Sequence, residues 1–146
     1  MSTFTSFMRG DHEQCDRRFA TAETAVASGD WQQADEAHRE FIESIRQHFA
    51  MEEVLLFPAF ELASGNATGP TAVMRHEHEQ MRSLLDEMGQ AVAQRDSDAY
   101  LGASETLLIL MQQHNGKEEQ ILYPMSDRML GVEREALLGK MRALGA

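Results

Sequence analysis

A pattern of eleven residues occurs twice in this chain and limits its fold more than any other feature. The stretch 48–58 reads HFAMEEVLLFP, and the stretch 114–124 reads HNGKEEQILYP. Both follow the pattern His-x-x-x-Glu-Glu-x-Leu/Ile-Leu-aromatic-Pro. In an α-helix, residues four positions apart lie about 40° apart around the axis and about 6 Å apart along it. The His and the first Glu of each copy therefore share one helix face, where both can contact one ion.

The repeat extends beyond this motif. The offset between the copies is 66 residues (114 − 48 = 66), and the same offset aligns MRGDHEQ at 8–14 with MRHEHEQ at 74–80, so that His12 corresponds to His78. Internal similarity at a fixed offset indicates a repeated structural unit. We therefore expect one domain over residues 1–146, built from two half-repeats at about 5–62 and 71–128.

Composition narrows the class of protein. A chain of 146 residues suits one domain, and its 42% apolar and 25% charged residues are typical of a soluble globule. A net charge of −11 argues against binding to nucleic acid or to an anionic membrane surface. No apolar run approaches the roughly 18 residues of a membrane span, and the N-terminus lacks the layout of a signal peptide. The single Cys cannot form an internal disulfide, so we expect a cytoplasmic protein.

The hydrophobic periodicity predicts helices throughout, and the ten Met with few β-branched residues favour helix over sheet. Five helices are expected, over residues 5–27, 30–58, 71–94, 98–124 and 131–145. Gly29 should end the first, Asp30 should cap the second, and Pro58 should end or kink the second. The segment 63–70 is the clearest linker. The predicted fold class is all-α, an up-down-up-down four-helix bundle with a short C-terminal fifth helix.

Apolar residues at helical spacing mark the faces that should be buried. The predicted stripes include, among others, Val73, Ile121, Val132 and Leu144. The last helix, with Val132, Leu137, Leu138, Met141 and Leu144 in one stripe, should cover the end of the bundle.

Six side chains should converge from the four long helices onto the apolar interior: His12, His48, Glu52, His78, His114 and Glu118. Burying imidazoles and carboxylates among apolar groups costs free energy unless other charges compensate them, and a pair of cations would do so. Six donors suffice for two ions if both carboxylates bridge. One ion would bind His12 and His48, the other His78 and His114, with solvent oxygen completing each coordination shell.

The donor types indicate which metal fits and what it does. A mixed nitrogen and oxygen set without thiolates suits iron best, with manganese or zinc possible. A coordination position left open in a dry pocket is typical of a centre that binds or reduces dioxygen or a similar small molecule.

Several neighbouring residues receive other interpretations. His38 and His76 lie off the shared face, so a structural or surface role is favoured over ligation. Glu53 and Glu119 are displaced by about 100° from the proposed bridging residues, which favours surface positions or a role as partners that orient an imidazole N–H. Cys15, which follows His12 by three residues, is best interpreted as a small buried apolar residue.

Phe57 and Tyr123, the aromatic residues that directly precede Pro58 and Pro124, are interpreted as packing residues of the core or of a channel end.

The pattern His…His-x-x-x-Glu…His…His-x-x-x-Glu, formed by the six residues above, resembles the hemerythrin-like family, also called HHE cation-binding domains, over about residues 5–126. The resemblance implies a four-helix bundle that holds two non-haem iron ions, bridged by two carboxylates and usually by an oxo or hydroxo group. Two features depart from the oxygen-carrying members. Met74 stands where they have a second third-helix His, and His114-x-x-x-Glu118 replaces their His-x-x-x-x-Asp. The chain is thus similar to the more symmetric bacterial hemerythrin-like proteins.

Three functions are compatible with these residues. The first is a non-haem di-iron protein that binds dioxygen, nitric oxide or peroxide for sensing, storage or scavenging. The second is a di-iron enzyme for peroxide or nitric oxide turnover, or for iron donation in iron–sulfur cluster repair. The third is a structural bundle that takes zinc or no metal and acts through protein contacts. A ferritin-type site is disfavoured because no His in the chain has a Glu three residues before it.

Overall fold

The computed structural model describes residues 2–145, and within them the chain is helical with no β-strand. Four long helices carry most of the chain: α1 (Phe4–Ser28), α2 (Trp31–Ala50), α4 (Pro70–Ala93) and α5 (Ser97–Lys117). Five shorter segments continue or follow them: η1 (Met51–Leu56), α3 (Phe57–Ser64), η2 (Glu118–Leu122), α6 (Tyr123–Met129) and α7 (Arg134–Gly145). The prediction of an all-α fold is confirmed.

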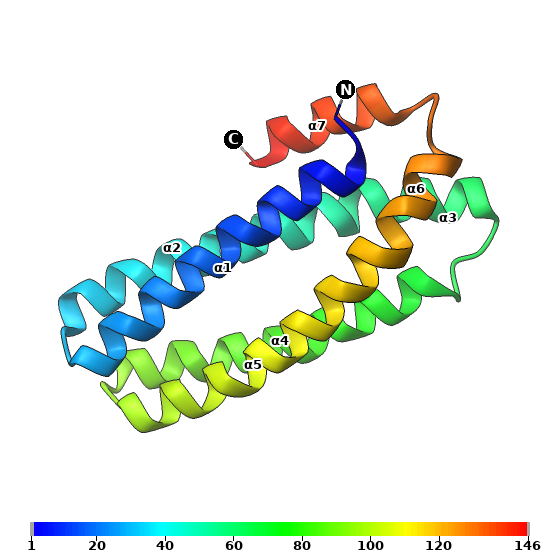
Figure 1. Ribbon diagram of the computed structural model, residues 1–146. Coiled ribbons are helices and arrows are strands. Elements are labelled where there is room, and N and C mark those ends of the chain that lie inside the picture. The colour runs from blue at the N-terminus through cyan, green and yellow to red at the C-terminus, as the bar shows by residue number, and fades with distance from the viewer. Residues whose placement is uncertain (1, 146) are drawn as a thin grey trace.

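The long helices pack as two hairpins laid face to face (Figure 1). Helix α1 packs along α2, and α4 packs along α5, while α1 also contacts α5 and α2 contacts α4. The result is a helical bundle in which four helices surround one interior. No helix within residues 2–145 has both the length and the apolar character needed to cross a membrane.

The hairpin turns follow the local signals in the sequence. Gly29 adopts a left-handed conformation with φ of 76°, and its N–H donates to the carbonyl oxygens of Ala25 and Val26, which ends α1. The Asp30 side chain then accepts a hydrogen bond from the N–H of Gln33 at 3.2 Å, as predicted for a helix cap. The chain therefore reverses direction within two residues.

Pro58 and Pro124 do not stop their helices. At each one the helix widens into a short π-helical turn, η1 or η2, and then continues as α3 or α6 with the Pro in its first turn. The N–H of Phe57 donates to the carbonyl of Glu52, five residues earlier, and the N–H of Tyr123 donates likewise to Glu118. The prediction that the helix could end near Pro58 is therefore wrong, because a wider turn accommodates a residue that lacks an N–H.

Four residues assigned to buried stripes are exposed: Val73 (48%), Ile121 (54%), Val132 (95%) and Leu144 (41%). Val73 adjoins buried Met74, and a step of one residue rotates a helical side chain by about 100°. Ile121 lies in η2, where the wider turn changes which side chains face inward. Val132 precedes α7, and Leu144 lies in its last turn.

Helix α7 therefore buries a narrower stripe than predicted. Its buried residues, Leu138 and Met141, belong to an apolar cluster with Phe4 and Met8 of α1 and with Met51 of η1. The helix thus packs along the outside of the bundle near the start of α1 (Figure 1).

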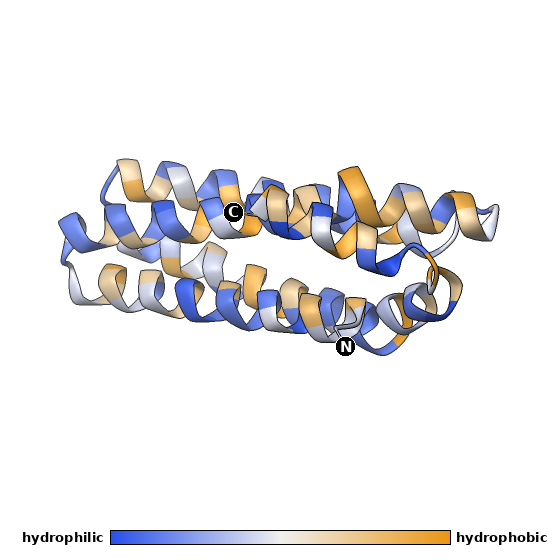
Figure 2. Ribbon diagram, turned by 90° about the horizontal axis from the view of Figure 1, so that it is seen from above, coloured by the Kyte–Doolittle hydropathy of each residue, from blue (hydrophilic) through white to orange (hydrophobic). Residues whose placement is uncertain are grey.

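The core consists of apolar clusters on either side of a layer of buried polar residues. The largest cluster includes Phe19, Phe41, Met88 and Tyr100, and it fills the end of the bundle that contains the hairpin turns. Two smaller clusters, which include Leu56, Phe60 and Leu122, fill the opposite end. Along the long helices, polar and apolar residues alternate (Figure 2). On α1 and α4 a buried His lies between residues of the two ends, and on α2 and α5 the buried His lies near the last residues of the largest cluster, shortly before η1 or η2.

Two glycine substitutions, one inside α1 and one directly after it, test this description of the helix and its end. We expect Gly29→Ala to lower the free energy of unfolding by about 1 kcal/mol, because a Cβ disfavours the left-handed conformation. The matched variant Gly10→Ala lies in the helix interior with open space around the added carbon, so we expect a gain of about 0.5–1 kcal/mol. Urea unfolding measures both, and changes of the same sign would contradict the assignment.

Candidate metal centre

The six side chains expected to converge do lie together inside the bundle, and each is at most 4% exposed. Helices α1, α2, α4 and α5 each supply one imidazole, and the two π-helical turns each supply one carboxylate. In order along the chain these residues are His12, His48, Glu52, His78, His114 and Glu118.

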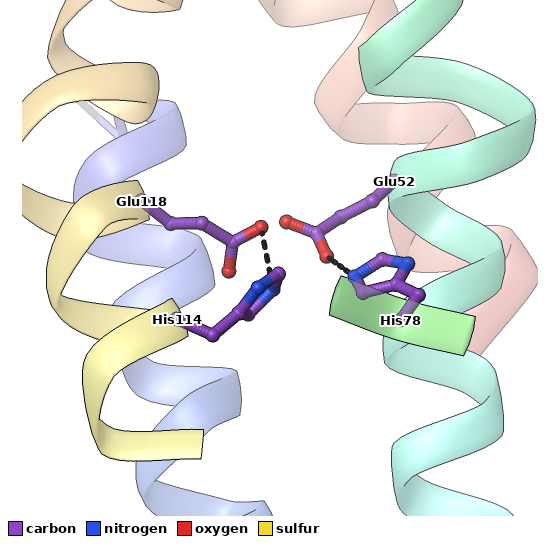
Figure 3. A group of neighbouring side chains, drawn as sticks. All are labelled: Glu52, His78, His114 and Glu118. Atoms are coloured by element: carbon purple, nitrogen blue, oxygen red, sulfur yellow. Dashed lines mark ion pairs between the residues drawn. The ribbon is translucent and has the colours of Figure 1, made fainter. Parts of the chain in front are cut away.

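One group of four donors combines both carboxylates with the imidazoles of α4 and α5. Glu52, His78, His114 and Glu118 each offer one atom, and these atoms lie within 4.8 Å of one another. Figure 3 shows Glu52 beside His78 facing Glu118 beside His114. The Nε2 atom of His78 lies 3.1 Å from Oε1 of Glu52, and the Nε2 atom of His114 lies 3.2 Å from Oε2 of Glu118.

A second group of three donors lies beside the first. Its members are His12, His48 and Glu118. The two Nε2 atoms are 3.0 Å apart, and Oε1 of Glu118 lies 3.2 Å from Nε2 of His12. Glu118 thus gives one oxygen to each group, and Oε1 of Glu52 lies 3.4 Å from Nε2 of His48 as well as near His78. Each carboxylate therefore spans two neighbouring sets of imidazoles.

Four of these atoms make close contacts without forming hydrogen bonds. Oε1 of Glu52, Oε2 of Glu118 and the Nε2 atoms of His78 and His114 are fully buried and have no hydrogen-bond partner of acceptable geometry. Buried polar atoms are nearly always hydrogen-bonded, so four such atoms in one place need an explanation. They fit a shared metal ion, which accepts lone pairs from several donors at once. The residues present thus fit a metal centre.

The second nitrogen of two imidazoles binds a glutamate from the other half of the chain. Nδ1 of His12 lies 2.8 Å from Oε2 of Glu119, and Nδ1 of His78 lies 2.7 Å from Oε2 of Glu53. Of the two roles left open for Glu53 and Glu119, the structure supports the one in which they orient imidazole N–H groups. Because a carboxylate accepts, each ring donates from Nδ1 and presents the Nε2 lone pair to the interior.

The remaining two imidazoles are held in the same way by acids that the sequence analysis missed. Nδ1 of His48 lies 2.6 Å from Oδ2 of Asp11, and Nδ1 of His114 lies 2.8 Å from Oε1 of Glu77. A signal for them existed, since Asp11 and Glu77 correspond to each other at the 66-residue offset and each directly precedes a His. All four imidazoles therefore have a carboxylate behind them.

Basic side chains at the surface support three of these acids. Arg9 donates to Glu119, Arg82 donates to Glu53, and Lys117 donates to Glu77. Burial alone would raise the pKa of Glu53 and of Glu77, but the hydrogen bonds from the basic groups and the imidazoles lower it. Both acids therefore stay ionised and remain hydrogen-bond acceptors for the rings.

Opposite charges dominate the electrostatics of the group. Burial alone would lower the pKa of His114, but Glu118 beside it raises the pKa to about 9. Burial likewise opposes the proton on His48, yet Glu52 and Asp11 raise that pKa well above its usual value. Burial alone would raise the pKa of the Glu52 carboxyl, but His48 holds this pKa well below its usual range. Imidazolium–carboxylate pairs therefore stabilise the metal-free centre.

Tyr123 belongs to this centre, although the sequence suggested only packing. Its buried hydroxyl lies 2.7 Å from Oε2 of Glu52 and 2.9 Å from Oε1 of Glu118, and it donates a hydrogen bond to the carboxylates. Its counterpart 66 residues earlier is Phe57, whose ring packs against His78 with centroids 5.7 Å apart. The packing interpretation is confirmed for Phe57 and incomplete for Tyr123. The sequence feature that could have indicated this role of Tyr123 is the change from Phe to Tyr between the two copies of the repeat.

The other two histidines lie outside the centre, as expected. His38 is buried, and its Nδ1 forms a 2.9 Å hydrogen bond with the hydroxyl of Tyr100. His76 is exposed on α4. An open groove of about 1150 Å³ runs between α2 and α4 beside His38, and none of the six central residues lines it.

A small cavity adjoins the group on the side of His12 and His48. Its volume is about 10 Å³, enough for roughly one water-sized molecule. Its apolar lining includes Ile45, Phe49, Met81 and Met111. Cys15 also lines it, and burial raises the pKa of this thiol to about 11, so the thiol is protonated near neutral pH.

Comparison with known proteins agrees with this description. The family described as "Hemerythrin HHE cation binding domain" matches residues 3–126, a span that contains all six central residues and Tyr123 and ends before α7. No curated protein and no solved structure matches the chain.

The raised pKa of His114 predicts how the stability of the metal-free protein depends on pH. Below about pH 6.5 the ring is protonated in both the folded and the unfolded chain, so its contribution is complete. Between pH 6.5 and about 9 the unfolded chain loses this proton first, so the free energy of unfolding should fall with pH, by about 1–3 kcal/mol. Urea unfolding of chelator-treated protein measures the slope. The His114→Gln variant should have a shallower slope, and equal slopes would contradict this electrostatic account.

Proposed function

Because the chain belongs to the family of hemerythrin HHE cation-binding domains, we propose that it is a non-haem di-iron protein. It binds dioxygen or a related small ligand, such as nitric oxide or peroxide, for sensing, storage or scavenging. The scaffold is the up-down-up-down four-helix bundle inferred from the sequence, with α7 added on its outside.

The observation that carries the proposal is the group of buried donor atoms without hydrogen-bond partners. His12 and His48 would hold one ion, and His78 and His114 would hold the other. Glu52 and Glu118 would contribute to both, because each approaches imidazoles of both sets. Nitrogen and carboxylate donors without thiolate suit iron better than a metal that prefers sulfur or an all-oxygen cage.

The chain prepares the centre for metal binding through the acids behind the imidazoles. Asp11, Glu53, Glu77 and Glu119 fix the orientation and the tautomer of the four rings. The rings therefore need little rearrangement to present Nε2 to an ion, which reduces the entropy lost on binding.

The surroundings of the centre favour a small ligand. The adjoining cavity of about 10 Å³ has room for a diatomic or similarly small molecule but not for an organic substrate. Its lining combines the apolar side chains of Ile45, Phe49, Met81 and Met111 with the polar side chains of Asp16 and Asn115. Two iron ions bound here would supply redox electrons and a coordination position for such a ligand.

Oxygen binding is tested on iron-loaded protein reduced without oxygen. We expect two iron ions per chain and a change in the near-ultraviolet and visible absorption when oxygen is added. The variant His114→Gln should lose at least one ion, because it removes a donor. The control His76→Gln changes an exposed imidazole and should behave like the wild type. An unchanged spectrum of the iron-loaded wild type would refute ligand binding, and peroxide consumption by the same sample would indicate an enzyme instead.

The outer acids, which are Asp11, Glu53, Glu77 and Glu119, give a second and quantitative expectation. Glu77→Gln should weaken metal affinity by about 10- to 100-fold, because a neutral amide holds the His114 ring less firmly. Glu87→Gln, which changes an exposed glutamate of the same helix, should leave the affinity unchanged. Competition with a chelator of known affinity measures both, and equal affinities would mean that Glu77 does not support the centre.

A further inference from the structure

Tyr123 lies among the proposed metal ligands, and the HHE pattern does not include it. Its side chain is fully buried, and it enters from the first turn of α6, directly after the π-helical turn that carries Glu118. We propose that the oxygen of Tyr123 is a seventh protein ligand, bound to the ion at the His12/His48 position. This inference rests on the proposed function, since it requires two metal ions.

Distances between donor atoms support ligation. Two donors about 2.1 Å from one ion and at right angles to each other are about 3 Å apart. The Tyr123 oxygen lies 2.7 Å from Oε2 of Glu52, 2.9 Å from Oε1 of Glu118 and 3.3 Å from Nε2 of His12. These three separations match neighbouring corners of one coordination shell. A tyrosine that only packed in the core would not approach three donor atoms at once.

The number of donors on each side points to the same ion. The His78/His114 side has a group of four convergent donors, whereas the His12/His48 side has only three. The Tyr123 oxygen approaches a nitrogen of the smaller group, 3.3 Å from His12. With Tyr123 included, this convergent group also has four members, and Glu52, whose Oε1 lies 3.4 Å from Nε2 of His48, would be a fifth donor on this side.

The half-repeat explains why only one ion gains this ligand. Phe57 occupies the equivalent position in the first half and stacks near His78, with the guanidinium of Arg75 5.4 Å above the ring. Its ring has no donor atom. The two ions would therefore differ even though their His and Glu ligands repeat, and the anionic oxygen would favour the ferric state of the ion beside His12.

Binding of the Tyr123 oxygen to the ion transfers a proton and changes no oxidation state. One metal–oxygen bond forms, the O–H bond of Tyr123 breaks, and the proton leaves to solvent. The hydrogen bond that the hydroxyl donates to the carboxylates is given up, which frees Oε2 of Glu52 and Oε1 of Glu118 for the metal ions.

Spectroscopy of the ferric protein tests the assignment. Iron bound to a phenolate has a visible charge-transfer band, and excitation within it enhances vibrations of the tyrosine ring in the resonance Raman spectrum. We expect both features in the wild type and their complete loss in Tyr123→Phe, with two iron ions per chain retained. The chain has only two tyrosines, so Tyr100→Phe is the matched control and should keep both features.

The outcomes separate this inference from the proposed function. Wild-type protein with two iron ions per chain but without tyrosine vibrations would overturn the ligand assignment and leave the di-iron proposal intact. Protein that takes up no pair of ions would overturn both. If Tyr123→Phe fails to fold, ring-deuterated tyrosine in the Tyr100→Phe variant labels Tyr123 alone. The enhanced vibrations should then shift with the isotope, and the lack of a shift would refute the assignment.

Discussion

The structure depends on keeping four imidazoles and two carboxylates inside an apolar bundle. Such groups lose their hydration when buried, so each needs a partner of opposite charge or a hydrogen bond. Four outer acids meet part of this need by binding the imidazole nitrogens that face outward. The nitrogens that face inward lie near the two central carboxylates, and those of His12 and His48 also lie near each other, with the Tyr123 hydroxyl beside His12. Metal ions are the natural partners for the atoms left without hydrogen bonds.

Two π-helical turns connect the fold to this centre. Each contains a central carboxylate and is followed by an aromatic residue and a Pro in the first turn of the next helix. A wider turn lets the chain pass the Pro without ending, and it directs Glu52 and Phe57, or Glu118 and Tyr123, inward together. The rule that Pro breaks a helix thus gives way here to a local widening that serves the centre.

The two halves of the chain repeat their imidazoles and acids but not everything around them. Tyr123 replaces Phe57, and Met81 stands where the first half has Cys15. Both differences lie at the centre or beside its cavity. A duplicated frame can therefore provide two similar sets of imidazole and carboxylate donors whose neighbours differ. If two ions bind as proposed, their surroundings would make them unequal, although the symmetric motif alone would suggest equivalent ones.

The sequence by itself determined the helices, the caps at Gly29 and Asp30, and the six residues that meet inside, because these follow from spacing along a helix. It also offered the support of imidazoles as one of two roles for Glu53 and Glu119. Only the tertiary structure decided that Asp11 and Glu77 do so too, that Tyr123 reaches both carboxylates, and that Ile121 faces outward. These depend on contacts between helices and on a change of helical pitch, and neither follows from the regular period of about 3.6 residues that the sequence pattern assumes.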